Sequence, residues 1–191
     1  MSVSTLDRYG GTLFDRLMQI GVVRDIAFIA VAAVVIALSA QISISLWFTP
    51  VPITGQTLAV LLVGATGGAL RGGRSLLVYL AGGAIGLPFF SPAGSPATYG
   101  YLGGFLAAAV VVGYLADRGW DRTYRRAVAA MLVGNIVIYL VGLPWLALNL
   151  GLDFGATLTA GLTPFIPGDI VKLLLAAAAL PSTWRLLGPR R

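Results

Sequence analysis

Three long apolar stretches dominate the pattern of hydrophobic and polar positions, at residues 26–70, 75–116 and 127–184. Only Asp153, Asp169 and Lys172 bring charge into them. A helix needs about 20 apolar residues to cross a bilayer, so each stretch can cross twice if it turns back in the middle. Segments rich in proline or glycine lie near the middle of each stretch, at residues 48–55, 87–96 and 151–168. The pattern predicts an all-α membrane protein with a six-helix transmembrane bundle.

The same pattern gives approximate helix boundaries. We expect transmembrane helices at residues 26–47, 56–70, 75–90, 101–116, 126–150 and 169–186. Several are short for a hydrocarbon core about 30 Å thick, so we expect thin or tilted elements with the proline-rich turns folded over one end. Residues 154–166 are expected to add a short helix at that end.

Residues 1–25 differ from the rest because they carry charges and lack a long apolar run. They show no short hydrophobic core followed by a small-residue cleavage site, so they do not resemble a cleaved signal peptide. Leu13, Phe14, Leu17 and Met18 have the spacing of one helix face, which predicts a helix on the cytoplasmic membrane surface, with a frayed leader as the alternative. We therefore expect a cytoplasmic or interfacial segment at residues 1–25 and a single transmembrane domain at residues 26–191.

Composition supports a bilayer as the main surroundings. The chain of 191 residues is 58% hydrophobic and 10% charged, against about 25% charged in a soluble domain. The net charge of +6 comes from arginines clustered at the feet of the three predicted hairpins, with none at their tips. The positive-inside rule then places both termini in the cytoplasm and the protein in the cytoplasmic membrane, and nucleic acid is not an expected partner.

The chain lacks most of the side chains that enzymes use. It contains no cysteine, histidine or glutamate, which removes the commonest nucleophile activators, general bases and metal ligands. An enzyme is not expected, and neither is a metal or a cofactor. An intramembrane hydrolase would need a serine–lysine pair, and no serine is visibly placed for one. No GxxxxGK[ST] loop is present, so the chain is not an ATPase.

Asp169 and Lys172 are the most informative polar residues. They lie three positions apart at the start of the last apolar run, so they share one helix face. In a structural interpretation, Asp169 stabilises the helix N-terminus and Lys172 extends toward the membrane surface. That interpretation explains Lys172 poorly, because the run that follows it continues deeper into the membrane. Charges inside spans usually have a function, which favours a site for a ligand or ion.

Other polar residues allow two interpretations each. Asn135, in the middle of a predicted helix, can join a ligand site or form an interhelical hydrogen bond. Thr54, Gln56 and Thr57 lie near the first turn, and Tyr99 and Tyr101 near the second. Tyrosine and tryptophan at such positions commonly form an interfacial belt, which also suits Trp47 and Trp145. Small residues four apart, such as Gly64 and Gly68, favour close helix packing.

Five segments together resemble the BioY family, the biotin-binding S components of energy-coupling factor (ECF) transporters. They are PVPITGQTLAVLLVGA (50–65), GGAIGLPFF (82–90), GYLGGF (100–105), GNIVIYLVGLPWL (134–146) and PFIPGDIVK (164–172). The resemblance runs in order from about residue 26 to residue 180. It implies a six-helix S component that binds biotin in an outward-facing pocket, covered by the loops at residues 48–55 and 87–99.

The resemblance also implies roles for particular residues. It assigns biotin binding to Asp169, Lys172, Asn135, Tyr101 and Gln56. Further residues are expected to line or cover the pocket: Thr54, Phe89, Phe90, Ser91, Tyr99, Trp145 and Phe165. Ala33 and Ala37 match a small-residue element that meets the transmembrane T component. Residues 91–104, SPAGSPATYGYLGG, depart from the glycine-rich stretch expected there, so the cover has a shape of its own.

The implied partners are biotin, the lipid bilayer, the T component and two cytoplasmic ABC ATPases that hydrolyse ATP. Two alternatives remain open at this level. One is an S component for another small anionic vitamin. The other is a structural membrane protein in which Asp169 and Lys172 only pair with each other.

Overall fold

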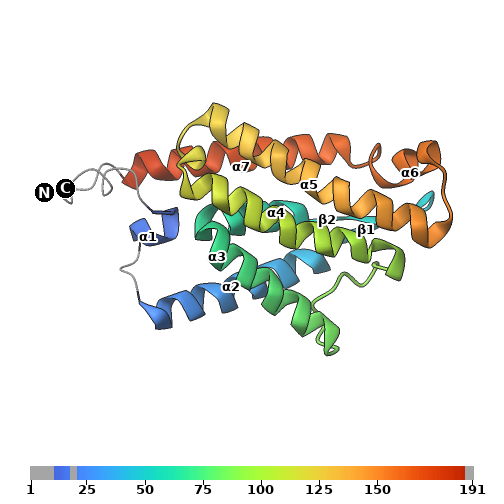
Figure 1. The fold of residues 1–191 in the computed structure, drawn as a ribbon, viewed down its shortest axis with the longest axis horizontal. Helices are drawn as coiled ribbons and strands as arrows, with labels where there is room; N and C mark the ends of the chain where they lie inside the picture. The colour runs from blue at the N-terminus through green and yellow to red at the C-terminus, as the bar shows by residue number, and fades with distance from the viewer. Residues whose placement is uncertain (1–10, 18–20, 188–191) are drawn as a thin grey trace, which may run out of the picture.

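The computed structural model describes residues 11–17 and 21–187 (Figure 1). Its elements follow in chain order: α1 Leu13–Leu17, α2 Val22–Gln41, β1 Ser43–Leu46, β2 Thr49–Thr54, α3 Gln56–Ala84, η1 Pro96–Thr98, α4 Tyr99–Asp117, η2 Trp120–Arg122, α5 Tyr124–Leu150, α6 Phe154–Gly161 and α7 Ile166–Leu187. Four helical segments are long and apolar enough to cross a membrane: α2, residues 96–117, α5 and α7. The prediction of a helical, multi-pass membrane protein is confirmed.

The second and third predicted helices lie together in α3, which reverses direction at Gly68. This residue has φ 80° and ψ 177°, a conformation that strongly favours glycine. A Cβ atom at Gly72 would lie 3.0 Å from Cα of Gly64, so the two halves of α3 run side by side. The backbone N–H of Ala69 donates to Oδ2 of Asp117 at 3.1 Å, which caps the second half. The turn was predicted at residues 71–74 and forms earlier, where glycine permits it.

The all-α prediction is wrong at residues 43–54, which form an antiparallel β-hairpin. The first predicted helix, at residues 26–47, instead begins at Val22 and ends at Gln41. β1 and β2 pair Ser43 with Thr54 and Ile44 with Ile53. Residues 49–54, TPVPIT, combine β-branched side chains with two prolines, which favours an extended backbone over a helix. The hairpin lies beside the start of α3, at the end of the bundle that also carries α6 (Figure 1).

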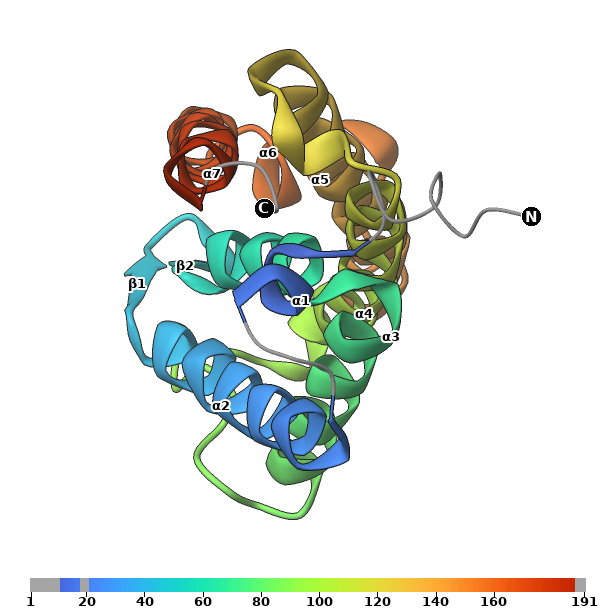
Figure 2. The same ribbon diagram turned by 90° about the vertical axis from the view of Figure 1, so that its left-hand side faces the viewer.

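Small residues allow the helices to pack closely, as their spacing predicted. α4 lies between α3 and α5. A Cβ atom at Gly64 would lie 2.6 Å from the carbonyl oxygen of Ala109, and one at Gly104 would lie 2.7 Å from that of Ile138. These contacts leave no room for a larger residue at either glycine. Viewed along the long axis, the helices pack around the two halves of α3 (Figure 2).

Ala33 and Ala37 belong to this internal packing, and their predicted role as a partner interface stays a prediction. They are 1% and 6% exposed, because that face of α2 is covered by the rest of the bundle. The opposite face of α2 is exposed and carries Val31, Val34 and Leu38. A partner helix would contact that face before it could reach the two alanines.

The predicted N-terminal helix is short and packs onto the bundle. Leu13 is buried, and the ring of Phe14 lies 4.6 Å from that of Phe28 on α2. Leu17 is exposed, whereas Met18 lies outside the described residues. Residues 1–10 and 18–20 also lie outside the described residues, so the structure covers only part of the predicted segment 1–25.

Candidate functional site

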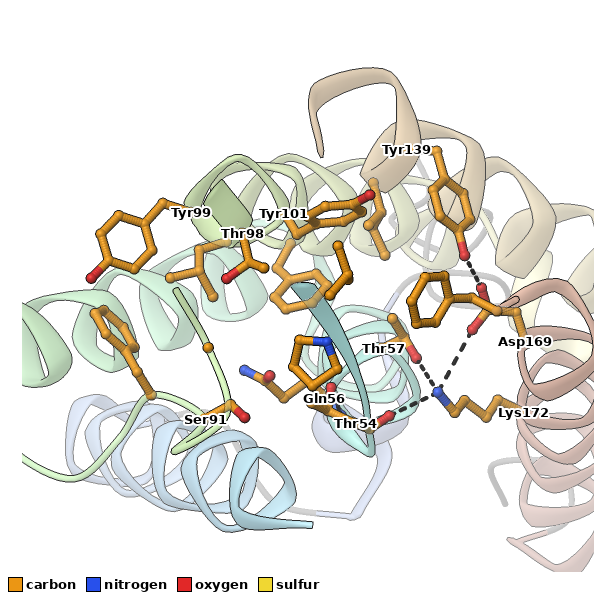
Figure 3. Close-up of a pocket in the computed structure, with 18 residues that line it drawn as sticks. Thr54, Gln56, Thr57, Ser91, Thr98, Tyr99, Tyr101, Tyr139, Asp169 and Lys172 are labelled. Carbon is orange, nitrogen blue, oxygen red and sulfur yellow. Dashed lines mark hydrogen bonds and ion pairs between the residues drawn. The ribbon is translucent and has the colours of Figure 1, made fainter. Parts of the chain in front are cut away.

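A cavity lies between the β-hairpin, the segment before α4 and the helices α3, α4, α5 and α7 (Figure 3). It holds about 830 Å³ of space free of protein atoms, including the open solvent of its mouth. Its apolar wall consists of Val51, Pro52, Phe90, Gly94, Leu102, Phe105, Ile138 and Phe165. Its polar lining consists of Thr54, Gln56, Thr57, Ser91, Thr98, Tyr99, Tyr101, Tyr139, Asp169 and Lys172.

The charged pair enters the cavity from the first turns of α7. The backbone N–H of Asp169 donates to the carbonyl oxygen of Phe165, so the aspartate lies within the helix, where its negative charge suits the macrodipole. Lys172 follows three residues later, on the same face. Its Nζ lies 3.6 Å from Oδ1 of Asp169, which is long for an ion pair.

Hydrogen bonds join this pair to three other elements. Lys172 Nζ donates to the carbonyl oxygen of Thr54 at 2.8 Å and to Oγ1 of Thr57 at 2.9 Å. The hydroxyl of Tyr139 on α5 donates to Oδ2 of Asp169. The ammonium thus donates two hydrogen bonds and faces Asp169 at a longer distance, whereas the carboxylate keeps lone pairs to spare. Figure 3 shows Asp169 between Tyr139 and Lys172, at one side of the cavity. The carboxylate is therefore the acceptor best able to receive a ligand's N–H groups.

Two further polar groups of the lining are held by internal bonds. Gln56 donates from Nε2 to the hydroxyl of Tyr79 at 2.6 Å, which leaves its amide oxygen as an acceptor. The hydroxyl of Tyr101 donates to the carbonyl oxygen of Gly161 at 2.9 Å, and its ring forms part of the wall. The hydroxyl oxygen of Ser91 is different, because it is buried and has no hydrogen-bond partner within residues 11–17 and 21–187.

The cavity brings together most of the residues predicted for the site. Both predicted covering segments contribute to it, the first through Thr54 and the second through Phe90, Ser91 and Tyr99. The predicted residues in the lining are Gln56, Thr54, Phe90, Ser91, Tyr99, Tyr101, Phe165, Asp169 and Lys172. Their roles in binding remain predictions.

Three predicted residues do not line the cavity. Asn135 is buried on α5 away from it. Phe89 stacks on Tyr79, with ring centroids 6.3 Å apart, and its ring covers Gly82, where no side chain competes for the space. Trp145 donates from its indole nitrogen to the carbonyl oxygen of Pro96 at 2.9 Å, which directs it toward the loop. The roles predicted for these three residues likewise remain predictions.

Sequence reasoning missed Tyr139 and left Thr57 out of the site. Tyr139 is a polar residue inside the apolar run IVIYLVG, four positions after Asn135, and so lies on the same side of the helix one turn nearer to the cavity. Thr57 follows Gln56, but only the position of α7 reveals its bond to Lys172. Within the described parts of the chain, no three acidic residues gather closely enough to hold a metal ion.

Comparisons with known proteins identify the family of the chain. The chain is 39% identical to the "Biotin transporter BioY" of Rhizobium etli over 169 residues, which cover 81% of this chain and 89% of that protein. It is 34% identical to the "Probable biotin transporter BioY" of Pyrococcus horikoshii, with coverage of 86% and 97%. Its fold matches a crystal structure described as the S-component for biotin from an ECF-type ABC transporter, with a TM-score of 0.74, 24% identity, and coverage of 87% of this chain and 93% of that one. The family model described as "BioY family" matches residues 10–189. The chain therefore belongs to the BioY family.

Proposed function

We propose that this protein captures biotin for uptake across the cytoplasmic membrane, as the substrate-binding S component of an ECF transporter. The observation that carries the proposal is the carboxylate of Asp169, which is held by Tyr139 at the side of an aromatic cavity and still has acceptor capacity. The names and the fold of the relatives support the same assignment. No catalytic step is assigned to the chain.

Biotin offers groups that complement this lining. Its ureido ring has two N–H donors and a carbonyl oxygen, fused to an apolar ring that carries a valeryl chain with a carboxylate. In our proposal Asp169 accepts from the ureido N–H groups, since it has free lone pairs. Phe90, Phe165 and the ring of Tyr101 cover the bicycle. Lys172 holds the β-hairpin through Thr54 and turns one hydrogen toward the ligand when biotin enters.

The carboxylate of biotin needs a different partner. Lys172 is the only cation of the described cavity lining, and protein acceptors already surround it. Ser91 has a hydroxyl without a hydrogen bond in the described structure and lies in the second covering segment. We assign the carboxylate to this side of the cavity, where a neutral donor such as Ser91 can meet it.

The proposed topology follows from the helices and the arginines. α2, the two halves of α3, α4, α5 and α7 would make six crossings. The start of α2, the turn within α3, the end of α4 and the end of α7 lie at the same end of the bundle as α1 (Figure 1). These segments carry Arg24, Arg71, Arg118 and Arg185, and this end would face the cytoplasm. The cavity then opens outward. A transmembrane T component and two ATPases would provide the energy for transport, in response to biotin-dependent closure.

The test is equilibrium binding of radiolabelled biotin to the purified protein in detergent. Parent, Asp169→Asn and Lys172→Met are compared with Asp153→Asn, which makes the same chemical change at the exposed start of α6, outside the cavity. We expect saturable binding by the parent and by Asp153→Asn, and its loss in Asp169→Asn. Folding is checked for each variant by size-exclusion chromatography and circular dichroism.

A competition series then tests the identity of the ligand. Desthiobiotin keeps the ureido ring and should displace labelled biotin, whereas an anionic vitamin without that ring should not. Displacement by the second compound alone would favour another vitamin as substrate. If the folded parent binds no biotin, the assignment is wrong, and if Asp169→Asn binds as well as the parent, the role of the charged pair is wrong.

A further inference from the structure

A second hollow lies on the other side of Tyr139, between α5 and α6. It holds about 900 Å³ of space free of protein atoms, including its open side. Its walls include Leu140, Leu143, Pro144, Ala147, Phe154 and Leu158. We name it the α5–α6 groove.

The lining of this groove has almost no polar group to offer a ligand. Its two hydroxyl groups, those of Tyr139 and Thr157, are both engaged elsewhere. Tyr139 donates to Asp169, and Thr157 donates to the carbonyl oxygen of Asp153 at 2.7 Å. A polar occupant would lose its hydrogen bonds with water and gain none here. The chemistry of the groove therefore fits a hydrocarbon chain.

The groove is continuous with the lipid-facing surface of the protein. α5 is one of the helices able to cross a membrane, and Leu140 and Phe154, which lie in the groove wall, are 68% and 81% exposed. The first described residues lie beside α1 and the last at the end of α7. Both lie at the opposite end of the bundle from α6 (Figure 1). Membrane lipid is thus the hydrocarbon source that lies directly against the groove.

We propose that the α5–α6 groove binds one acyl chain of a membrane phospholipid. The chain packs against Leu143, Ala147 and Leu158, and it contacts the ring of Tyr139 on the side away from the cavity. Because Tyr139 lines both hollows, the bound lipid supports the ring whose hydroxyl holds Asp169 (Figure 3). The groove is then a lipid site built back to back with the ligand site.

The test uses the full chain in nanodiscs of phosphatidylcholine doped with a phosphatidylcholine that carries a diazirine on one acyl chain. After irradiation, labelled peptides are mapped by mass spectrometry. We expect label to concentrate within residues 136–162, several-fold above the exposed faces of α2 and α7, at every probe fraction. A surface lipid in the annular shell would label all of these exposed faces about equally.

A matched pair of variants locates the site. Ala147→Phe fills the groove from α5 and should reduce labelling of residues 136–162 several-fold. Ala178→Phe makes the same change at an exposed position of α7 and should leave that labelling unchanged. Equal labelling of the exposed faces of α2, α5 and α7 in the parent would overturn the proposal, and so would full labelling of residues 136–162 in folded Ala147→Phe.

Discussion

The two ends of the bundle use charged side chains in different ways. We call the end that carries Arg24, Arg71, Arg118 and Arg185 the arginine end. There, Arg71 contacts Asp15 at 2.8 Å and Asp25 at 2.9 Å, and its guanidinium lies 5.0 Å from the ring centre of Phe14. At the cavity end, Lys172 and Asp169 are 3.6 Å apart. The first set has short, direct ion pairs. In the second, the lysine is shared with Thr54 and Thr57, and the carboxylate keeps acceptor capacity.

In our proposal, this difference separates a structural role for Arg71 from a binding role for the cavity pair. Arg71 joins α1 and α2 to α3, and its charge is matched by two carboxylates. Burial alone would raise the pKa of Asp15, but hydrogen bonds from Arg71 and Thr12 lower it below its usual value, which shows that the site favours the ionised form. The cavity pair instead leaves polar capacity facing an open space. This contrast supports the proposal that the cavity pair binds a ligand.

The largest expected effect comes from removing the acceptor at the cavity end. Asp169→Asn replaces one carboxylate oxygen by an amide donor, which opposes the ureido N–H groups and the ammonium of Lys172. We expect the Kd for biotin to rise about 100-fold or more, since truncating a buried charged hydrogen bond costs about 2–5 kcal/mol. Isothermal titration calorimetry measures the change, and a normal melting temperature of the variant shows that the loss is local.

The arginine end should show the opposite behaviour. Arg71→Met leaves Asp15 and Asp25 without their shared guanidinium and keeps an unbranched side chain at this position. We expect the free energy of unfolding to fall by about 1–3 kcal/mol, between the values for exposed and buried pairs because water partly screens this site. Chemical denaturation in detergent measures it. Biotin affinity should stay within about twofold of the parent's; a loss comparable to that of Asp169→Asn would end the proposed division of roles.

The contrast also shows what the sequence could reveal. Asp169 and Lys172 were identifiable because two charges in an apolar run are costly and lie on one helix face. The run length and the arginine clusters likewise predicted a helical membrane protein. The turn at Gly68 and the β-hairpin were missed, because a glycine among many carries little signal and the TPVPIT segment resembles a loop.

The hydrophobic pattern of the sequence could not predict which way individual side chains point. Phe89 and Phe90 are adjacent in sequence, yet Phe90 lines the cavity and Phe89 covers Gly82. Asn135 and Tyr139 are one turn apart on α5, and only Tyr139 reaches Asp169. Ala33 and Ala37 have the spacing of an interface, but the same spacing serves the packing of α2 within the bundle. The direction of each of these side chains depends on neighbours that are distant in sequence.

Tyr139→Phe sharpens the comparison at the cavity end. The change removes one hydroxyl and keeps the ring that separates the cavity from the α5–α6 groove. Asp169 then loses the donor that fixes its orientation, and we expect biotin affinity to fall about tenfold, in line with about 1.4 kcal/mol for one charged hydrogen bond. Stopped-flow measurement should show faster dissociation. Tyr114→Phe, an exposed tyrosine of α4, serves as the control.

Ser91→Ala tests the proposed position of the ligand carboxylate. We expect a loss of only about threefold for biotin, because a neutral hydrogen bond contributes about 0.5–1.5 kcal/mol. Biotin methyl ester should show less sensitivity to the same change, because its neutral ester accepts a weaker hydrogen bond. Competition against labelled biotin measures both. Equal losses for the acid and the ester would place the carboxylate elsewhere.

The smallest effect belongs to Asp121, a buried carboxyl at the arginine end. It is 1% exposed and accepts a hydrogen bond from the indole of Trp184, and within the described residues its Oδ1 has no hydrogen-bond partner. Burial raises the pKa of Asp121 above its ordinary value of 3.8; Asp117 adds to this shift, and Trp184 and Arg122 oppose it. The folded protein therefore holds this proton more tightly than the unfolded chain.

The sign of the pH effect follows from that raised pKa. The contribution of Asp121 to stability is fully present below the unfolded pKa and is lost as the pH rises through the folded pKa. Asp121→Asn cannot ionise and still accepts from Trp184, so it should be slightly more stable than the parent at pH 7, and this advantage should disappear as the pH falls toward 3.8. Differences in melting temperature between variant and parent isolate the effect from other groups, with the exposed Asp153→Asn as control. A constant difference across this range would mean that Asp121 is ionised as readily in the folded protein as in the unfolded chain, and that even a buried acid at the arginine end has its charge fully compensated.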